Sequence, residues 1–406
     1  MPIIPHLAGT WNGAPDVLFY AVRILYYFML MTAGGAMLLT FAIPAGESGA
    51  GQRKLLHQWS GFGMRGLLLA VLLFVFVHAN RTVSSLGGGG EAWVKLLTET
   101  STGQAWLGLI VLSFLGFAVI RLNDTVKIIW ALLLLGVESF EGHAAASEHA
   151  TAAIVSDFIH LACAAVWAGG VLLLLLFWKA DREEAGRFAE RFAAIAWITM
   201  AVLTVSGIVM TWLLIPSWLY LLYTDWGNWL AAKAIIVLLV IALGTILRAR
   251  AKKRELQRGA LLKLDGILMA CIIAAAGVIT YLSPAPDSEP LHHHEMGEDF
   301  HYTLSISPNA PGPNDVGLTI WLPEDSGEPS DLQLSFVSAD NPGRKPVEIE
   351  LMPAESDEED FGFPGFTRYY YAADDMKLPR PGNWKAMLVV TEADGNKLER
   401  EAVFSN

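Results

Sequence analysis

Eight long apolar segments precede residue 284, and they constrain the fold of this chain more than any other feature. They lie near 17–43, 63–82, 104–120, 126–142, 158–178, 192–215, 228–248 and 262–283. Each is close to the ~20 residues that a helix needs to cross the hydrocarbon core of a bilayer. The chain is 53% hydrophobic and only 17% charged. Residues 1–283 are therefore predicted to form an all-α polytopic membrane bundle of eight transmembrane helices.

Basic residues in the short loops predict the orientation of these helices, because lysine and arginine favour the cytoplasmic side. The connection between the seventh and eighth segments is strongly basic: Arg248, Arg250, Lys252, Lys253, Arg254, Arg258 and Lys263. Loops on the opposite side hold few basic residues, among them Arg81 and Lys95. We expect a multi-pass protein of the bacterial plasma (inner) membrane with both termini extracytoplasmic. All of the histidines except His57 would then lie on the outer side.

Residues 284–406 have a different character, with 24 acidic and 8 basic residues. Prolines in 284–299 resist helix formation and predict a stiff linker. Seven short β-branched and aromatic segments follow, near 300–307, 316–322, 331–337, 346–352, 366–372, 384–391 and 398–404. This spacing is typical of an all-β Ig-like sandwich. We predict an extracytoplasmic sandwich over 300–406, and its acidity argues against nucleic acid as a partner.

The fifth apolar segment carries the strongest candidate for chemistry. Asp157, His160 and Cys163 are three residues apart, so they share one face of a helix. Ionisable groups are costly in hydrocarbon and are rarely placed there without a function. Imidazole and thiol are ligands that suit copper. The alternative is an interfacial His160 hydrogen-bonded to Asp157. Gly169-Gly170 would let a neighbouring helix approach closely.

Further candidate metal ligands fall near the same predicted depth. They are His78, Glu138, His143 and His149, and a solvated polar loop is the alternative for the last two. Met210 in the sixth segment offers a thioether, which favours Cu(I), although methionine also fills gaps in cores. Lys233 either reaches toward the interface or pairs with an aspartate such as Asp157.

A second group of histidines lies in the predicted linker and just beyond it. His292, His293, His294 and His301 are accompanied by Met296 and acidic residues. Clustered histidine with methionine captures copper or zinc loosely. An inert polar linker is the alternative.

Residues 138–283 resemble the copper resistance protein D (CopD) family. The resemblance rests on Asp157-x-x-His160, Ala-Ala-Val-Trp167-Ala-Gly169-Gly170, Gly186-Arg-Phe188, Thr204-x-Ser206-Gly207, and Tyr223 to Gly227 with Lys233. Residues 300–406 are similar to YtkA-like and FixH-like extracytoplasmic domains, through Pro311-Gly-Pro-Asn314 and Pro381-Gly-Asn-Trp384.

The CopD resemblance implies a membrane copper protein that is usually regarded as an importer. Some relatives carry an N-terminal copper-binding domain, whereas only about 16 residues precede the first segment here. We expect the C-terminal sandwich or a separate extracytoplasmic copper chaperone to receive copper instead.

The sequence thus predicts a copper-binding membrane protein for copper uptake and homeostasis, with copper and the lipid bilayer as partners. It has no phosphate-binding loop and no nucleophile elbow, which argues against an ATP-driven pump. As a transport or binding protein, it is expected to have no catalytic residues and no enzyme activity. One alternative is a haem-b electron-transfer protein with His78 and His160 as iron ligands. Another is a module that delivers copper to a respiratory oxidase.

Overall fold

The computed structural model describes residues 14–85, 87–140, 147, 149–215, 217–253, 259–286, 288–297, 299–355 and 363–406. The chain divides into two compact units. The first comprises residues up to Leu214 together with Trp229–Leu282. The second comprises Ile215–Asn228 and Ser283–Asn406.

The first unit is helical. Its helices are α1 (Ala14–Leu38), α2 (Ala50–Ser85), α3 (Gly90–Glu99), α4 (Ser101–Val119), α5 (Asp124–Ser139), α7 (Ala150–Ala180), α8 (Arg182–Leu214), α10 (Asp225–Lys252) and α11 (Gly259–Ile279). Two 3₁₀ turns, η1 (Leu39–Ala42) and η2 (Glu47–Gly49), link α1 to α2. The short helix α9 (Tyr220–Tyr223) lies in the second unit.

Seven helices in the described parts of the chain are long and apolar enough to cross a membrane. The predicted multi-pass membrane bundle is therefore confirmed. The fourth predicted segment, near 126–142, corresponds to α5, which has only 16 residues. This helix is shorter than the ~20 residues of a typical span. It is held by burial of Trp130, Leu134 and Leu135.

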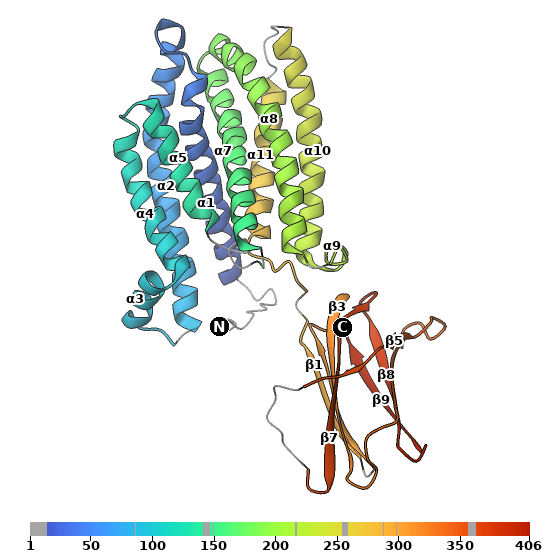
Figure 1. Ribbon diagram of the computed structural model, residues 1–406. Helices are drawn as coiled ribbons and strands as arrows, with labels where there is room; N and C mark the ends of the chain where they lie inside the picture. Colours follow the sequence, from blue (N-terminus) through green and yellow to red (C-terminus); the bar gives the residue numbers. More distant parts are fainter. Residues whose placement is uncertain are drawn as a thin grey trace. The chain divides into compact units, whose positions relative to one another are not determined.

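Helix α1 occupies the middle of the bundle and packs against α2, α5, α7 and α11 (Figure 1). The contact with α7 is close because two glycines meet there. A Cβ on Gly35 would lie 1.7 Å from the Ala165 carbonyl oxygen, and one on Gly169 would lie 2.4 Å from the Gly35 carbonyl carbon. A Cβ on Gly170 would lie 2.0 Å from the Phe192 ring of α8. The close approach predicted for Gly169-Gly170 is confirmed.

Successive long helices run in opposite directions (Figure 1). Helices α1, α4, α7 and α10 begin at one end of the bundle, which we call the first end; α2, α5, α8 and α11 finish there. The opposite end is called the second end.

The second unit contains an antiparallel β-sandwich, as predicted. Its strands are β1 (Leu291–Met296), β2 (His301–Ser307), β3 (Gly312–Pro323), β4 (Asp331–Ser338), β5 (Val347–Ile349), β6 (Met352–Pro353), β7 (Phe366–Leu378), β8 (Asn383–Thr391) and β9 (Lys397–Ser405). One sheet has the order β1-β2-β3-β7-β6 and the other β5-β4-β8-β9. Alternate residues of both sheets fill the core, including Leu318, Phe336 and Leu388.

Strand β1 lies within residues 284–299, which were predicted to form a linker. Its register pairs Leu291 with Ile306 and Met296 with His301. The strand forms because its side chains alternate, with His292, His294 and Met296 more exposed than the residues between them. The first histidine-rich residues are therefore part of the edge of a sheet.

Candidate functional site

His160 lies on the face of α7 that contacts α8. Its Nδ1 atom is 3.0 Å from the Ser206 hydroxyl oxygen, and the ring also packs against Gly207, where a Cβ would lie 3.4 Å from Cε1 of His160. The side chain is half-buried.

The Ser206 hydroxyl defines which nitrogen of His160 carries the proton. This hydroxyl donates to the Val202 carbonyl, 2.8 Å away, and lies 3.2 Å from the Leu203 carbonyl. Because its single proton points to the backbone, it accepts a hydrogen bond from Nδ1–H of His160. The Nε2 atom of neutral His160 then keeps its lone pair, and it makes no hydrogen bond within the described residues. This tautomer leaves Nε2 available to a metal ion.

Ser206, rather than Asp157, therefore orients the His160 ring. The carboxylate of Asp157 instead interacts with the hydroxyl of Ser139 on α5. Lys233 of α10 is within electrostatic range of both Asp157 and His160, yet it makes no direct ion pair in the part of the chain that the structure describes. The hydrogen bond to Ser206 was missed because the sequence does not show which face of α8 meets α7.

His78 has a different environment, because both of its ring nitrogens have partners. Nδ1 is 2.8 Å from the Phe74 carbonyl oxygen, and Nε2 is 3.2 Å from Nη1 of Arg23. An arginine only donates, so Nε2 accepts and Nδ1–H donates to the backbone. The rings of Phe19 and Phe74 also pack against His78, with centroids 4.0 and 4.1 Å away.

Glu138 is buried, with 4% of its surface exposed, and is hydrogen-bonded by two tyrosines of α1. The Tyr26 hydroxyl donates to its carboxylate, and Tyr27 does the same. Arg23 of α1 is near enough to act on Glu138 electrostatically. Arg23, Tyr26 and Tyr27 were not identified from the sequence, although an arginine within an apolar segment is itself a signal of function.

The remaining predicted ligands are not gathered into one centre. Among the described residues, no group of three or more His, Cys, Asp or Glu side chains is placed to hold a metal. His149 is exposed at the start of α7, and His143 falls outside the described residues. Cys163 and Met210 are half-buried. Helices α2 and α7, which carry His78 and His160, contact each other only slightly, and α1 packs against both.

Side chains that contain sulfur do form a stripe along the contact between α7 and α8. Met210 is four residues from Ser206, and Cys163 is three residues from His160, so each shares a face with the His160–Ser206 contact. Because α7 and α8 run in opposite directions, Met210 lies toward the first end and Cys163 toward the second.

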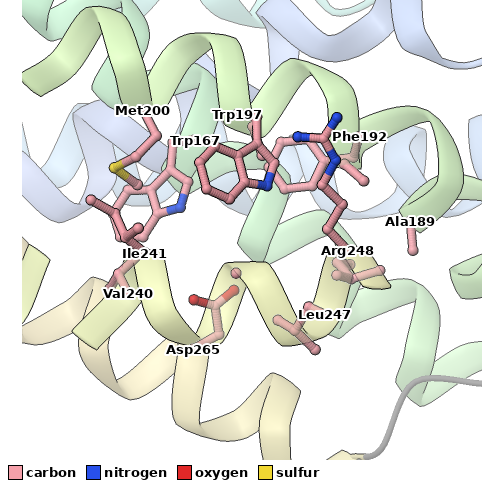
Figure 2. Close-up of a pocket in the computed structure, with 14 residues that line it drawn as sticks. Trp167, Ala189, Phe192, Trp197, Met200, Val240, Ile241, Leu247, Arg248 and Asp265 are labelled. Carbon is pink, nitrogen blue, oxygen red and sulfur yellow. The ribbon is translucent and has the colours of Figure 1, made fainter. Parts of the chain in front are cut away.

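The same face of α7 continues to a cavity of about 70 Å³. Figure 2 shows Trp167, Met200 and Asp265 around it, from α7, α8 and α11. Arg248 of α10 also lines this cavity and lies over the Trp197 ring at 5.4 Å. Asp265 is buried and makes no hydrogen bond or ion pair to any described residue. A cavity of this size has room for several water molecules.

Comparisons with known proteins identify the family of the chain. The model of "Copper resistance protein D" matches residues 186–283, and that of "Copper resistance protein D-like, N-terminal domain" matches residues 14–153. The "Inner membrane protein YebZ" of Escherichia coli (strain K12) is 31% identical over 262 residues, which cover 58% of this chain and 82% of that protein. The chain belongs to the copper resistance protein D family.

The "Copper transport protein CutJ" of Bacillus subtilis (strain 168) is a further relative, 28% identical over 360 residues. The alignment covers 82% of this chain but 64% of CutJ, so the chain spans less than two thirds of that protein. No solved structure matches the chain significantly. Membership of the copper resistance protein D family supports a copper-related function in a membrane. It also extends the likeness seen at 138–283 to the first helices.

Proposed function

We propose that this protein binds copper at His160 and moves it across the membrane along the contact between α7 and α8. The observation that carries the proposal is the orientation of His160. Ser206 holds its Nδ1–H, and Nε2 keeps a free lone pair. Met210 and Cys163 offer soft sulfur donors one helical turn away on either side, and sulfur favours Cu(I).

The cavity at Trp167, Met200 and Asp265 supports a path toward the second end. Met200 supplies another thioether, and Asp265 supplies a buried carboxylate without a described partner. A cation that leaves His160 along this face of α7 would next meet the side chains of Met200 on α8 and Asp265 on α11 at the cavity.

We further propose that the first end faces outward and that copper enters there. Basic residues favour the cytoplasmic side, and they are concentrated near the second end: Arg53, Lys54, Lys127, Lys179, Arg182, Arg187, Arg191, Arg248 and Lys253. Uptake is then the direction that this arrangement favours.

His160→Ala tests the binding site directly. In detergent-purified full-length protein under reducing, oxygen-free conditions, we expect the variant to lose one bound Cu(I) per chain. His57→Ala is the matched control, because His57 is an exposed imidazole on α2 that plays no part in the proposed site. Unchanged copper stoichiometry in His160→Ala would contradict the proposal.

Delivery of copper to a partner is a second candidate function, and the histidine-bearing edge of the sandwich favours it. The two candidates differ in whether this protein alone carries copper through a membrane. Copper entry into liposomes that contain only this protein would support transport, whereas binding without entry would support delivery.

Haem binding by His78 and His160 has less support. The Nε2 atom of His78 already accepts a hydrogen bond from Arg23, and its Nδ1–H is held by the Phe74 carbonyl. A haem ligand needs one of these nitrogens free. Copper-family membership and the stripe of sulfur donors favour copper as the cargo.

A further inference from the structure

The outer face of strands β1 and β2 carries two histidines and a methionine side by side. Burial alternates along β1, and its more exposed set is His292, His294 and Met296. Strand β2 presents His301 and Thr303 on the same face, because Tyr302 and Leu304 between them are buried in the core. The register places Met296 directly opposite His301, and His294 opposite Thr303.

Directly opposed residues have Cβ atoms about 4.5–5.5 Å apart, and diagonal neighbours are within reach of long side chains. Met296 and His301 are an opposed pair, and His294 is a diagonal neighbour of His301. His294 and His301 are close enough for their charges to interact. Three soft or borderline donors therefore lie within one small area.

Aromatic side chains pack beside these donors. The Phe363 ring lies 4.8 Å from the His301 ring and 6.2 Å from the His294 ring, as measured between centroids. The Trp321 ring is 5.9 Å from His294 and 5.3 Å from Phe363. The two imidazoles thus share one aromatic neighbour, which shields this side of them from water.

The hydrogen bonds leave coordinating positions open on both histidines. Nδ1 of His301 is buried and has no hydrogen-bond partner within the described residues. A buried polar atom without a partner costs free energy, and a metal ion would offset that cost. Nδ1 of His294 is 2.8 Å from the Thr303 hydroxyl. When this hydroxyl accepts the Nδ1 proton, Nε2 of His294 keeps its lone pair.

We propose that His294, Met296 and His301 bind one Cu(I) ion on the outer face of β1 and β2. Two imidazoles and a thioether suit Cu(I), whereas hard ions prefer oxygen ligands. The identity of the ion rests on the proposed copper function, but the geometry of the site does not. The site would hold copper outside the bundle, separately from His160.

The other two histidines of this segment are outside the site. The His293 ring lies 5.8 Å from the Tyr302 ring, and its Nε2 is 3.7 Å from the Glu295 carboxylate. It alternates with His294 and so belongs to the opposite face of β1. His292 pairs with Ser305, two positions further from Met296 than His294. Of the four clustered histidines, the strand register thus places His294 and His301 in the site and leaves His292 and His293 outside it.

Copper binding to the full-length protein in detergent tests this site, with a coloured Cu(I) chelator as competitor under oxygen-free conditions. We expect Met296→Leu to weaken the binding of one copper ion. The double variant with His294→Ala and His301→Ala should lose the binding of that ion. Met296 is 64% exposed, so its substitution leaves the sandwich core intact. Met352→Leu is the matched control, because Met352 is an equally exposed methionine in the same sheet, and it should bind copper as the unmodified protein does.

His160→Ala in the same assay separates the two proposals. Retention of the copper held by the sandwich in His160→Ala, and its loss in the His294/His301 double variant, supports the sandwich site. If the sandwich variants bind copper like the unmodified protein while His160→Ala loses an ion, the sandwich site is overturned and the bundle site stands. If only the sandwich variants lose copper, the sandwich site stands and the function proposed for His160 fails.

Discussion

His78 and His160 differ in what their ring nitrogens contact, and this difference assigns them different roles. His160 is held through one nitrogen by Ser206, whereas both nitrogens of His78 are engaged. The sequence placed both residues at a similar depth and offered no way to separate them. Arg23, which determines which ring nitrogen of His78 carries the proton, lies 55 residues earlier in the chain.

His78→Gln should lower stability and leave copper binding unchanged. The substitution breaks the contacts to Arg23 and Phe74 and leaves a buried donor unpaired, which costs about 1–3 kcal/mol. Thermal unfolding in detergent would measure the loss, and metal analysis would measure bound copper. Loss of a copper ion in this variant would mean that His78 is a ligand after all.

Asp340 should make the stability of the sandwich depend on pH in the acidic range. Hydrogen bonds from the backbone and side-chain nitrogens of Asn383 hold the pKa of Asp340 below its ordinary value of 3.8. The folded state therefore favours the ionised carboxylate. This contribution to stability is present above pH 3.8 and is lost as the pH falls through the lower folded-state pKa.

Asp340→Asn should remove that part of the acid dependence. The asparagine keeps the shape of the side chain but carries no charge to titrate. Calorimetry of the sandwich transition in the full-length protein, between neutral pH and pH 3, would compare the two proteins. Equal slopes of melting temperature against pH would contradict the role given to Asp340.

At the scale of helices, the position of His160 depends on how closely α7 packs against α1 and α8. Gly169 faces α1 and Gly170 faces α8, and neither has room for a Cβ. The sequence predicted close packing at this glycine pair because small residues serve that purpose in membranes. It did not predict which helices would meet there, since helix partners are set by contacts between distant parts of the chain.

Gly169→Ala should destabilise the bundle by about 1–3 kcal/mol, the typical cost of overpacking. The added methyl group would meet the backbone of α1, which cannot move aside cheaply. Gly63→Ala is the control, because a Cβ at Gly63 meets nothing within 4 Å. Thermal unfolding of the two variants in detergent would compare them, and equal stability would contradict the packing described here.

At the scale of the whole molecule, the sequence predicted the order of its parts well. Long apolar segments and alternating short ones each carry their own periodicity, so the membrane bundle and the sandwich followed from local patterns. The short helix α5 and strand β1 departed from the predictions, because both depend on neighbours rather than on their own composition. The convergence of ligands also depends on tertiary contacts, so the contacts of Ser206 and Phe363 with the histidines were not predicted.

Transport of copper by this protein alone is the central claim, and liposomes test it most directly. The full-length protein would be reconstituted without other proteins, Cu(I) would be added outside, and a chelating dye inside would report its entry. We predict faster entry than into protein-free liposomes, loss of that difference in His160→Ala, and full activity in His57→Ala. Entry at the protein-free rate, or equal entry with His160→Ala, would contradict the account.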